Sequence, residues 1–170
     1  VINEVQSEGY DVTIIGKSKK SKKDYELSQY IDSSIFIVNN YDPNQKYKVL
    51  LAVDNSPGTK KAVKYSVRIA QAFNIGIEVV TVSKTDEFRE DYKNASQWAT
   101  KFLRRNKINY HKSFEVGDPV EIISSKAGKN HIVVMGSSSS NPLKTFFAGN
   151  KPLTVLKNSQ CPILIVKLIH

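Results

Sequence analysis

Cysteine is almost absent from this chain of 170 residues, in which Cys161 is the only one. One cysteine cannot form an internal disulfide, which is typical of a protein in a reducing compartment, so we expect a cytoplasmic location. No apolar run approaches the roughly 18 residues that would indicate a membrane span, and no signal peptide opens the chain. The chain begins at Val1 rather than Met, which suggests a processed product or a fragment of a longer polypeptide.

Patterns for metal binding and catalysis are missing as well. The three histidines, His111, His131 and His170, show no metal-ligand spacing and form no motif with a cysteine or a carboxylate. There is no P-loop lysine motif, no GxGxxG after the first strand, and no carboxylate pair with assignable roles. The serines at 137–140 have no neighbouring base that would activate a nucleophile. We therefore expect no catalytic residue and no metal site in the protein.

The net charge of +9 is unevenly distributed. Residues 1–45 hold five lysines and seven acids, or −2, whereas residues 46–170 hold twenty basic and nine acidic residues, or +11. A basic domain favours anionic partners such as nucleotides, nucleic acid or a membrane surface. The charges are scattered rather than striped, so solubility is the simpler explanation and nucleic-acid binding is not expected.

Residues 46–170 alternate between strand and helix patterns. Strands are predicted at 47–53, 77–82, 108–116, 131–136 and 162–168, the third being the most polar and therefore at a sheet edge. A first helix is predicted to follow Ser56 as N-cap, a second spans about 86–106, and a third is capped by Asp118. Five strands with intervening helices predict an α/β fold with a doubly wound parallel sheet.

The apolar spacing of the three helices predicts which residues they bury. The first helix should bury Ala62, Val63, Ser66, Val67, Ala70 and Phe73. The second has an apolar stripe of Phe88, Tyr92, Ala95, Ala99 and Phe102, widened by Trp98 and Leu103. The third should bury Val120, Ile123 and Ala127.

The N-terminal residues repeat the second half of this unit. The segment VINEVQSEGYDVTIIG (1–16) mirrors VEIISSKAGKNHIVVMG (120–136), and SQYIDSSIFIV (28–38) mirrors LKNSQCPILIV (156–166). We interpret residues 1–45 as the C-terminal half of a first domain and 46–170 as a complete second one; chance resemblance between α/β halves is the alternative. Strand 34–38 should pair with the strand near 163–167, because without this pairing both apolar strands would be exposed at sheet edges.

The complete unit resembles the universal stress protein domain over essentially all of residues 46–170. The resemblance rests on YKVLLAVDNSPGTKKAVKYSVRIAQAF, GDPVEII, VVMGSSSSNPLKTFFAGN and VLKNSQCPILIVK. It implies a five-stranded parallel sheet in the order 3-2-1-4-5, of the adenine-nucleotide alpha hydrolase-like type. It also implies tandem copies, with the last strand used for pairing in a homodimer or pseudo-dimer.

Nucleotide-binding members of that family carry Gly, two residues, Gly, nine residues, Gly, then Ser or Thr. Gly136 and Gly149 keep this spacing here, while Ser139 replaces the second glycine and Asn150 the hydroxyl residue. A serine adds a Cβ near the phosphates but its hydroxyl can donate to one, and asparagine can still present an amide to an oxygen.

The resemblance assigns a nucleotide site at the carboxyl edge of the sheet. It implies that Asp54, after Val53, contacts the ribose or adenine, and that the backbone near Thr81 and Val82 meets the adenine edge. Phosphates would be surrounded by the loop from Gly136 through Ser137 and Ser139, and by Gly149, Asn150 and Lys151. The half repeat has Gly16 followed by KSKKSKK and no later glycine, so the phosphate motif is absent from it.

Three function hypotheses remain open from the sequence. The first is a non-enzymatic stress-response protein that binds ATP or AMP, with Mg²⁺ as a possible companion, and signals through dimerisation. The second is a nucleotide-free interaction module, such as the cytosolic tail of a membrane transporter. The third is slow ATP hydrolysis.

Overall fold

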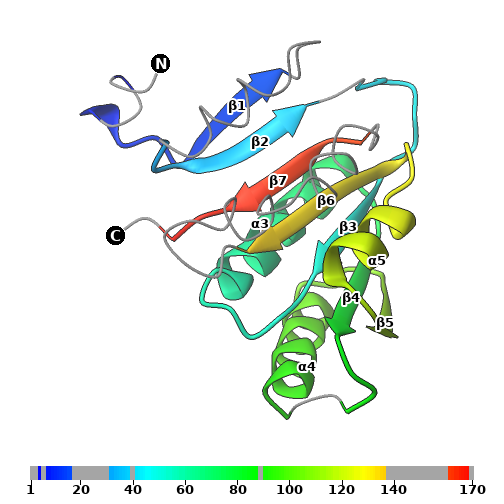
Figure 1. Ribbon diagram of the computed structural model, residues 1–170. Helices are drawn as coiled ribbons and strands as arrows, with labels where there is room; N and C mark the ends of the chain where they lie inside the picture. Colours follow the sequence, from blue (N-terminus) through cyan, green and yellow to red (C-terminus); the bar gives the residue numbers. More distant parts are fainter. Residues whose placement is uncertain are drawn as a thin grey trace.

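The computed structural model describes residue 4 and residues 7–16, 31–38, 41–87, 90–136 and 161–168. Seven strands and three helices lie in these ranges (Figure 1). The strands are β1 (Val12–Gly16), β2 (Ser34–Val38), β3 (Lys48–Ala52), β4 (Ile77–Ser83), β5 (Tyr110–Val116), β6 (His131–Gly136) and β7 (Ile163–Val166). The helices are α3 (Thr59–Phe73), α4 (Glu90–Arg105) and α5 (Pro119–Lys126).

The seven described strands form one sheet in the order β1-β2-β7-β6-β3-β4-β5. Every neighbouring pair is parallel except β2 and β7, which are antiparallel. Counted within residues 46–170, the strands lie in the order 3-2-1-4-5. The α/β class and the parallel sheet predicted from the sequence are therefore present, and β5 lies at a sheet edge as its polarity indicated.

Strands β2 and β7 join the N-terminal part of the sheet to the rest of it. Ile35 faces Ile165 and Ile37 faces Ile163, so Phe36 and Leu164 stand opposite each other at the centre of the pair. The predicted pairing of 34–38 with the strand near 163–167 is thereby confirmed, within a single chain. It buries four isoleucine side chains that would otherwise line two open edges.

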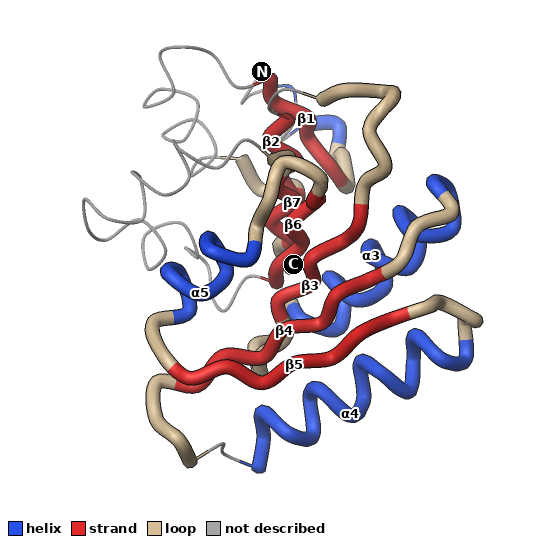
Figure 2. Tube along the Cα trace, turned by 90° about the vertical axis from the view of Figure 1, so that its right-hand side faces the viewer, coloured by secondary structure: helices blue, strands red, loops and turns tan. Residues whose placement is uncertain are grey.

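Helices cover both faces of the sheet (Figure 2), with α3 and α4 on one face and α5 on the other. Successive residues of a strand point to opposite faces, so Val49 and Leu51 of β3 pack toward α3 and α4, whereas Leu50 packs on the side of α5. Full burial of such a side chain contributes roughly 1.5–3 kcal/mol. The near-continuous apolar sequences of β3, β4 and β6 are explained by this two-sided cover.

Helix α3 begins later than the sequence pattern predicted. Ser56 is not its N-cap, because the helix starts at Thr59 with Gly58 in the capping position and no side-chain cap. The Ser56 hydroxyl instead lies 3.1 Å from Thr59 Oγ1, and both residues are bound to Asp54. The carboxylate organises a turn before the helix, and this turn delays the first helical residue.

The buried stripe of α3 is also shorter than predicted. Ala62, Val63, Val67 and Ala70 are buried as expected, but Phe73 is 55% exposed. Phe73 is the last helical residue, and Asn74 then adopts a left-handed conformation that turns the chain toward β4. The last helical position therefore lies beyond the core.

The stripes of α4 and α5 are only partly as predicted. In α4 the buried positions are Ser96, Ala99, Thr100 and Leu103, while Tyr92, Ala95, Trp98 and Phe102 are half-buried. Phe88 lies outside the described residues. In α5 the predicted cap is confirmed, because Asp118 Oδ1 accepts from the backbone N–H of Val120 and Glu121 at 2.9 and 3.1 Å. Ile123 is buried there, and Val120 and Ala127 are half-buried.

None of the helices in the described ranges combines the length and apolarity needed to cross a membrane.

Candidate functional site

Three of the segments assigned to the site by resemblance meet at the carboxyl edge of the sheet. Strand β3 lies between β4 and β6, and all three run parallel. Val53 and Asp54 follow the end of β3, Thr81 and Val82 lie near the end of β4, and Gly136 ends β6. From β3 the chain crosses to β4 on one side, and it later returns to β6 on the other. Ligands of α/β folds bind at such a switch in strand order.

Asp54 is held in place by the loop that follows it. Its Oδ1 atom accepts hydrogen bonds from the Ser56 N–H at 3.0 Å and from the Thr59 hydroxyl at 2.5 Å. Within the described part of the chain, both hydrogen bonds to this carboxylate end on Oδ1. An ionised carboxylate accepts through two oxygens, so Oδ2 remains able to accept from a hydroxyl or an amine. The half-buried Asp54 is thus oriented by one oxygen and offers the other.

The side chain of Val53 has a structural role. Its side chain is 2% exposed and belongs to the core beneath α3 and α4, and its N–H donates to the Val80 carbonyl at 2.9 Å. This bond is the last one described between the β3 segment and β4. The ladder between these two segments therefore stops before β4 does.

The backbone of Val82 faces the place where β3 has ended. In β4 the N–H of Ile77 bonds toward β5 and the carbonyl of Ser83 accepts from Gly117 on that same side, whereas the carbonyl of Val80 bonds toward β3. Alternation along the strand directs the N–H and C=O of Val82 toward β3 as well, and those of Thr81 toward β5. A donor and an acceptor of Val82 are consequently presented beside Asp54.

Thr81 contributes a second polar feature to this region. Its side chain is fully buried, and its Oγ1 has no hydrogen-bond partner among the described residues. A buried hydroxyl without a partner is unfavourable by about 1–3 kcal/mol.

Gly136 is required by close packing. A Cβ placed on it would lie 2.5 Å from the Thr59 nitrogen and 2.8 Å from the Gly58 oxygen, and would also overlap the Gly58 carbonyl carbon. The start of α3 therefore lies directly against the end of β6. This contact brings the N-terminus of a 15-residue helix to the same edge as Asp54 and Val82.

The remaining residues assigned to the site, Ser137, Ser139, Gly149, Asn150 and Lys151, lie outside the described residues, as does the lysine-rich segment 17–23.

Sequence reasoning missed two residues of this site, Ser56 and Thr59. The sequence predicted Ser56 as a helix cap and assigned no role to Thr59, although both bind the carboxylate of Asp54. The pattern Asp-x-Ser-x-x-Thr could have revealed them, because an aspartate commonly bonds the backbone two residues on.

The same loop is also bound to a second helix. Asn55 Nδ2 donates to Asp91 Oδ2 of α4 at 2.5 Å.

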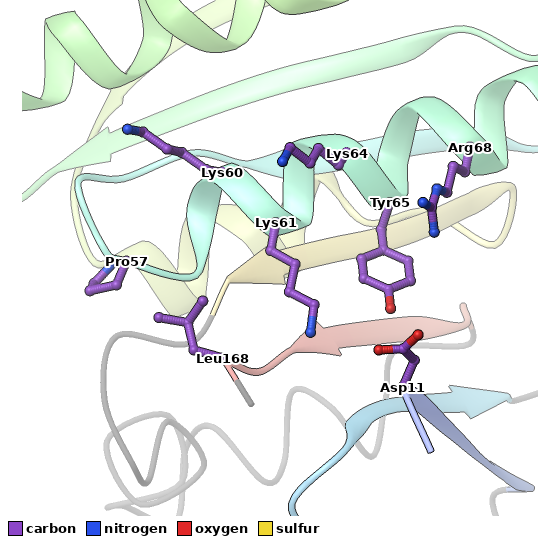
Figure 3. Close-up of a pocket in the computed structure, with 8 residues that line it drawn as sticks. All are labelled: Asp11, Pro57, Lys60, Lys61, Lys64, Tyr65, Arg68 and Leu168. Carbon is purple, nitrogen blue, oxygen red and sulfur yellow. The ribbon is translucent and has the colours of Figure 1, made fainter. Parts of the chain in front are cut away.

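A basic groove runs along α3 from its first turn (Figure 3). Its volume is about 460 Å³. One side is α3, and the other includes Asp11, just before β1, and Leu168, beyond β7. The lining residues are Asp11, Pro57, Lys60, Lys61, Lys64, Tyr65, Arg68 and Leu168.

Tyr65 lies between two of the cations of this groove. Lys61 Nζ is 5.9 Å and Arg68 Cζ is 5.8 Å from the centre of its ring. Burial raises the pKa of the Tyr65 hydroxyl, the negative charge of Asp11 raises it further, and Arg68 opposes both. None of the four cations forms an ion pair with another described residue. The prediction that the basic residues are scattered is therefore wrong for α3.

His131 is buried and hydrogen-bonded, which indicates a structural role. It is buried at the start of β6, and its Nδ1 accepts from the Gly128 N–H at 3.0 Å. Its Nε2 lies 3.4 Å from Glu78 Oε2. Burial alone would raise the pKa of Glu78, but hydrogen bonds and charges from Lys48 and His131 lower it on balance.

Among the described residues, no group of three possible metal ligands is present.

Comparison with known proteins agrees with this architecture. The sequence model of the universal stress protein family matches residues 47–167. A universal stress protein of Methanocaldococcus jannaschii is 24% identical over 159 residues, which cover 83% of this chain and 92% of that protein.

Solved structures extend the likeness to the whole chain. A universal stress protein from Archaeoglobus fulgidus has a TM-score of 0.72 at 20% identity, over 98% of this chain and 64% of its own. This chain thus spans about two thirds of the length of that structure. A universal stress protein solved in complex with cAMP has a TM-score of 0.59 at 20% identity, over 73% of this chain and 98% of its own. The fold, the carboxyl-edge geometry and the family match agree: this chain belongs to the universal stress protein family.

Proposed function

We propose that the protein binds an adenine nucleotide at the carboxyl edge of its second unit, and that it acts in the cytoplasm as a non-enzymatic stress-response or signalling protein. The single observation that carries this proposal is the backbone of Val82, which lies on the side of β3 beyond the last hydrogen bond of that strand, where Asp54 follows. A donor and an acceptor on one residue match the edge of adenine, which has an exocyclic amine beside a ring nitrogen. Support also comes from a family member solved with cAMP.

The residues have distinct roles in this proposal. The Val82 carbonyl accepts from the adenine amine, its N–H donates to the adjacent ring nitrogen, and Asp54 Oδ2 accepts from a ribose hydroxyl. Gly136 lets α3 begin close to the site, where the positive end of its dipole favours phosphate. Ser137, Ser139, Gly149, Asn150 and Lys151 are assigned to the phosphates on the sequence motif. Mg²⁺, where present, would bind mainly to phosphate oxygens, as is usual for this ion.

Isothermal titration with ATP and Mg²⁺ tests the proposal. Asp54→Asn should weaken binding by about tenfold or more, because a hydrogen bond to a charged group contributes roughly 1.5–3 kcal/mol. Thr59→Val is the matched control: it loosens the same loop but keeps the carboxylate, so it should lower affinity much less. No heat at millimolar ATP would refute the proposal. Equal losses in the two variants would assign Asp54 to loop structure alone.

The basic groove favours a second function, that of a nucleotide-free interaction module. Four cations without ion pairs in the described residues, beside a single carboxylate, would attract an acidic polypeptide segment. Binding of a glutamate-rich peptide should weaken with salt and be lost in Lys61→Glu/Arg68→Glu. Lys93→Glu/Arg105→Glu on the exposed face of α4 makes the same charge change elsewhere and should bind as the unaltered chain does. Equal effects of the two double variants would leave only net charge as the cause.

A further inference from the structure

One end of the basic groove lies at the carboxyl edge of the sheet. Pro57 lines the groove there, in the turn that holds the Asp54 carboxylate. Across from Pro57 is Leu168 (Figure 3), two residues beyond Val166, which pairs with Gly136 at the end of β6. Because Gly136 also lies against the start of α3, this end of the groove is next to the place where the proposed function puts the phosphates.

The charges change along the groove. At the carboxyl edge it is lined by Lys60 and Lys61 of the first turn of α3, and Lys61 extends toward β7 (Figure 3). Tyr65 lies one turn further along the same face of the helix. The Asp11 carboxylate points toward the hydroxyl of Tyr65 (Figure 3), and Arg68 lies beyond this ring. The groove therefore begins with cations alone and has a carboxylate and a hydroxyl further along.

Asp11 indicates which kind of ligand fits the inner part of the groove. A carboxylate repels phosphate, and it would equally repel the side chains of a glutamate-rich segment. Asp11 forms no ion pair with another described residue, so its oxygens can accept hydrogen bonds. The pKa of the Tyr65 hydroxyl is raised, so this group keeps its proton at neutral pH and can both donate and accept. Such a pair suits an uncharged group with several hydroxyls, such as a ribose.

The size of the groove agrees with a ligand larger than phosphate. Its volume of about 460 Å³ lies within the range of roughly 300–1,000 Å³ that is usual for sites of whole small molecules. A chain of phosphates along the lysines would leave the part beside Tyr65 and Asp11 empty. That part has room for a nucleoside.

We propose that the groove continues the nucleotide site, and that the two together bind a dinucleoside polyphosphate, in which a chain of phosphates joins two nucleosides. The first nucleoside is the one assigned to Val82 and Asp54, so this inference rests on the proposed function. The phosphate chain passes Gly136 and contacts Lys61, and the second ribose donates to Asp11. The groove is then part of one ligand site rather than a separate surface for a polypeptide.

Isothermal titration with AMP, adenosine tetraphosphate and diadenosine tetraphosphate at one fixed ionic strength tests this proposal. We expect the affinity to rise in that order. Diadenosine tetraphosphate should bind about tenfold more tightly than adenosine tetraphosphate, because its second ribose gains a hydrogen bond to a charged group. Attraction by net charge alone predicts the opposite order for these two ligands, since the free terminal phosphate of adenosine tetraphosphate carries additional negative charge.

Two variants separate the parts of the groove. Asp11→Ala should weaken binding of diadenosine tetraphosphate by about tenfold. Binding of adenosine tetraphosphate should stay unchanged or become tighter in this variant, because a repulsive charge is removed. Lys61→Gln should weaken both tetraphosphates by about threefold or more and leave AMP unaffected. Lys93→Gln, on the exposed face of α4, is the matched control and should affect none of the three ligands.

Failure of this inference differs from failure of the proposed function. If AMP and adenosine tetraphosphate bind but diadenosine tetraphosphate binds no more tightly, the groove holds no second nucleoside and this inference alone is refuted. If none of the three ligands binds, both are refuted. If diadenosine tetraphosphate binds most tightly but Asp11→Ala and Lys61→Gln behave as the unaltered chain does, the second nucleoside lies outside the groove and the inference is again refuted.

Discussion

Gly136 and Gly58 lie in direct backbone contact, which joins the end of β6 to the start of α3 with no room for a side chain. The two residues are 78 positions apart in the sequence. Their contact fixes the height of α3 above the sheet at the edge where Asp54 and Val82 meet. One missing methyl group thus determines how near the helix can come to the candidate site.

We predict that Gly136→Ala destabilises the protein by about 1–3 kcal/mol, the range for overpacking, or more because its neighbours are backbone atoms that cannot rotate away. Gly16→Ala is the control, since the Cβ meets open space. It should be neutral or stabilise the unaltered chain by up to about 1 kcal/mol, by restricting the unfolded state. Urea unfolding measures both. Equal effects would contradict the close packing at Gly136.

Thr59→Val should lower the free energy of unfolding by about 1–2 kcal/mol. The substitution removes the hydroxyl that donates to the Asp54 carboxylate, and hydrogen bonds to charged groups contribute about 1.5–3 kcal/mol. Thr85→Val removes only an exposed bond of 3.3 Å and should change stability little. If the two variants unfold at the same urea concentration, the Thr59 bond does not stabilise the turn before α3.

Asp118→Ala should destabilise the protein by about 0.5–2 kcal/mol, because two N–H groups at the start of α5 lose their acceptor. Asp118→Asn keeps an oxygen at the cap and should recover most of the loss. The midpoint of urea unfolding reports both effects. An asparagine variant as unstable as the alanine variant would indicate that charge, rather than the hydrogen bond, is what the helix requires.

The stability of the protein should depend on Glu78 in a defined pH window. Its pKa is lowered in the folded state, so ionised Glu78 stabilises the fold above its ordinary pKa of 4.5, and this contribution is lost as the pH falls through the lowered value. The contribution is modest because the side chain is 36% exposed. Urea unfolding of Glu78→Gln and of the unaltered chain should differ at pH 6 and converge as the pH falls below the lowered pKa of Glu78.

Lys48→Met provides the partner experiment for Glu78. Lys48 Nζ donates to Glu78 Oε1 at 3.1 Å and contributes to the lowered pKa. In a Lys48→Met background, the effect of Glu78→Gln at pH 6 should therefore shrink. An undiminished effect would leave His131 as the group that matters.

Local patterns in the sequence predicted the elements whose structure depends on local chemistry. The strands of 46–170, the Asp118 cap and the polar edge strand β5 follow from apolar spacing and short-range hydrogen bonding. The β2–β7 joint was also predictable, because two apolar strands in a repeat each needed a partner. The Ser56 cap was wrong, because Asp54 holds the Ser56 N–H and the Thr59 hydroxyl in a turn before the helix, and a capping rule does not consider such a turn.

Features built from distant segments could not be predicted in this way. The basic groove needs Asp11 and Leu168, from opposite ends of the chain, to lie beside the cations of α3. Only the end of the β3 ladder shows that Val82, rather than Thr81, presents its backbone toward Asp54. Both features depend on where the backbone turns or where a strand stops pairing. The spacing of apolar residues in the sequence does not indicate either of these positions.

The antiparallel joint between β2 and β7 has a mechanical consequence. Ile35 and Ile37 point into one core cluster, and Phe36 points to the opposite face. A slip of one residue along this joint would move both isoleucines out of the core, so sliding is opposed by the whole apolar pattern rather than by single bonds. The joint therefore resists shear between the two parts of the sheet.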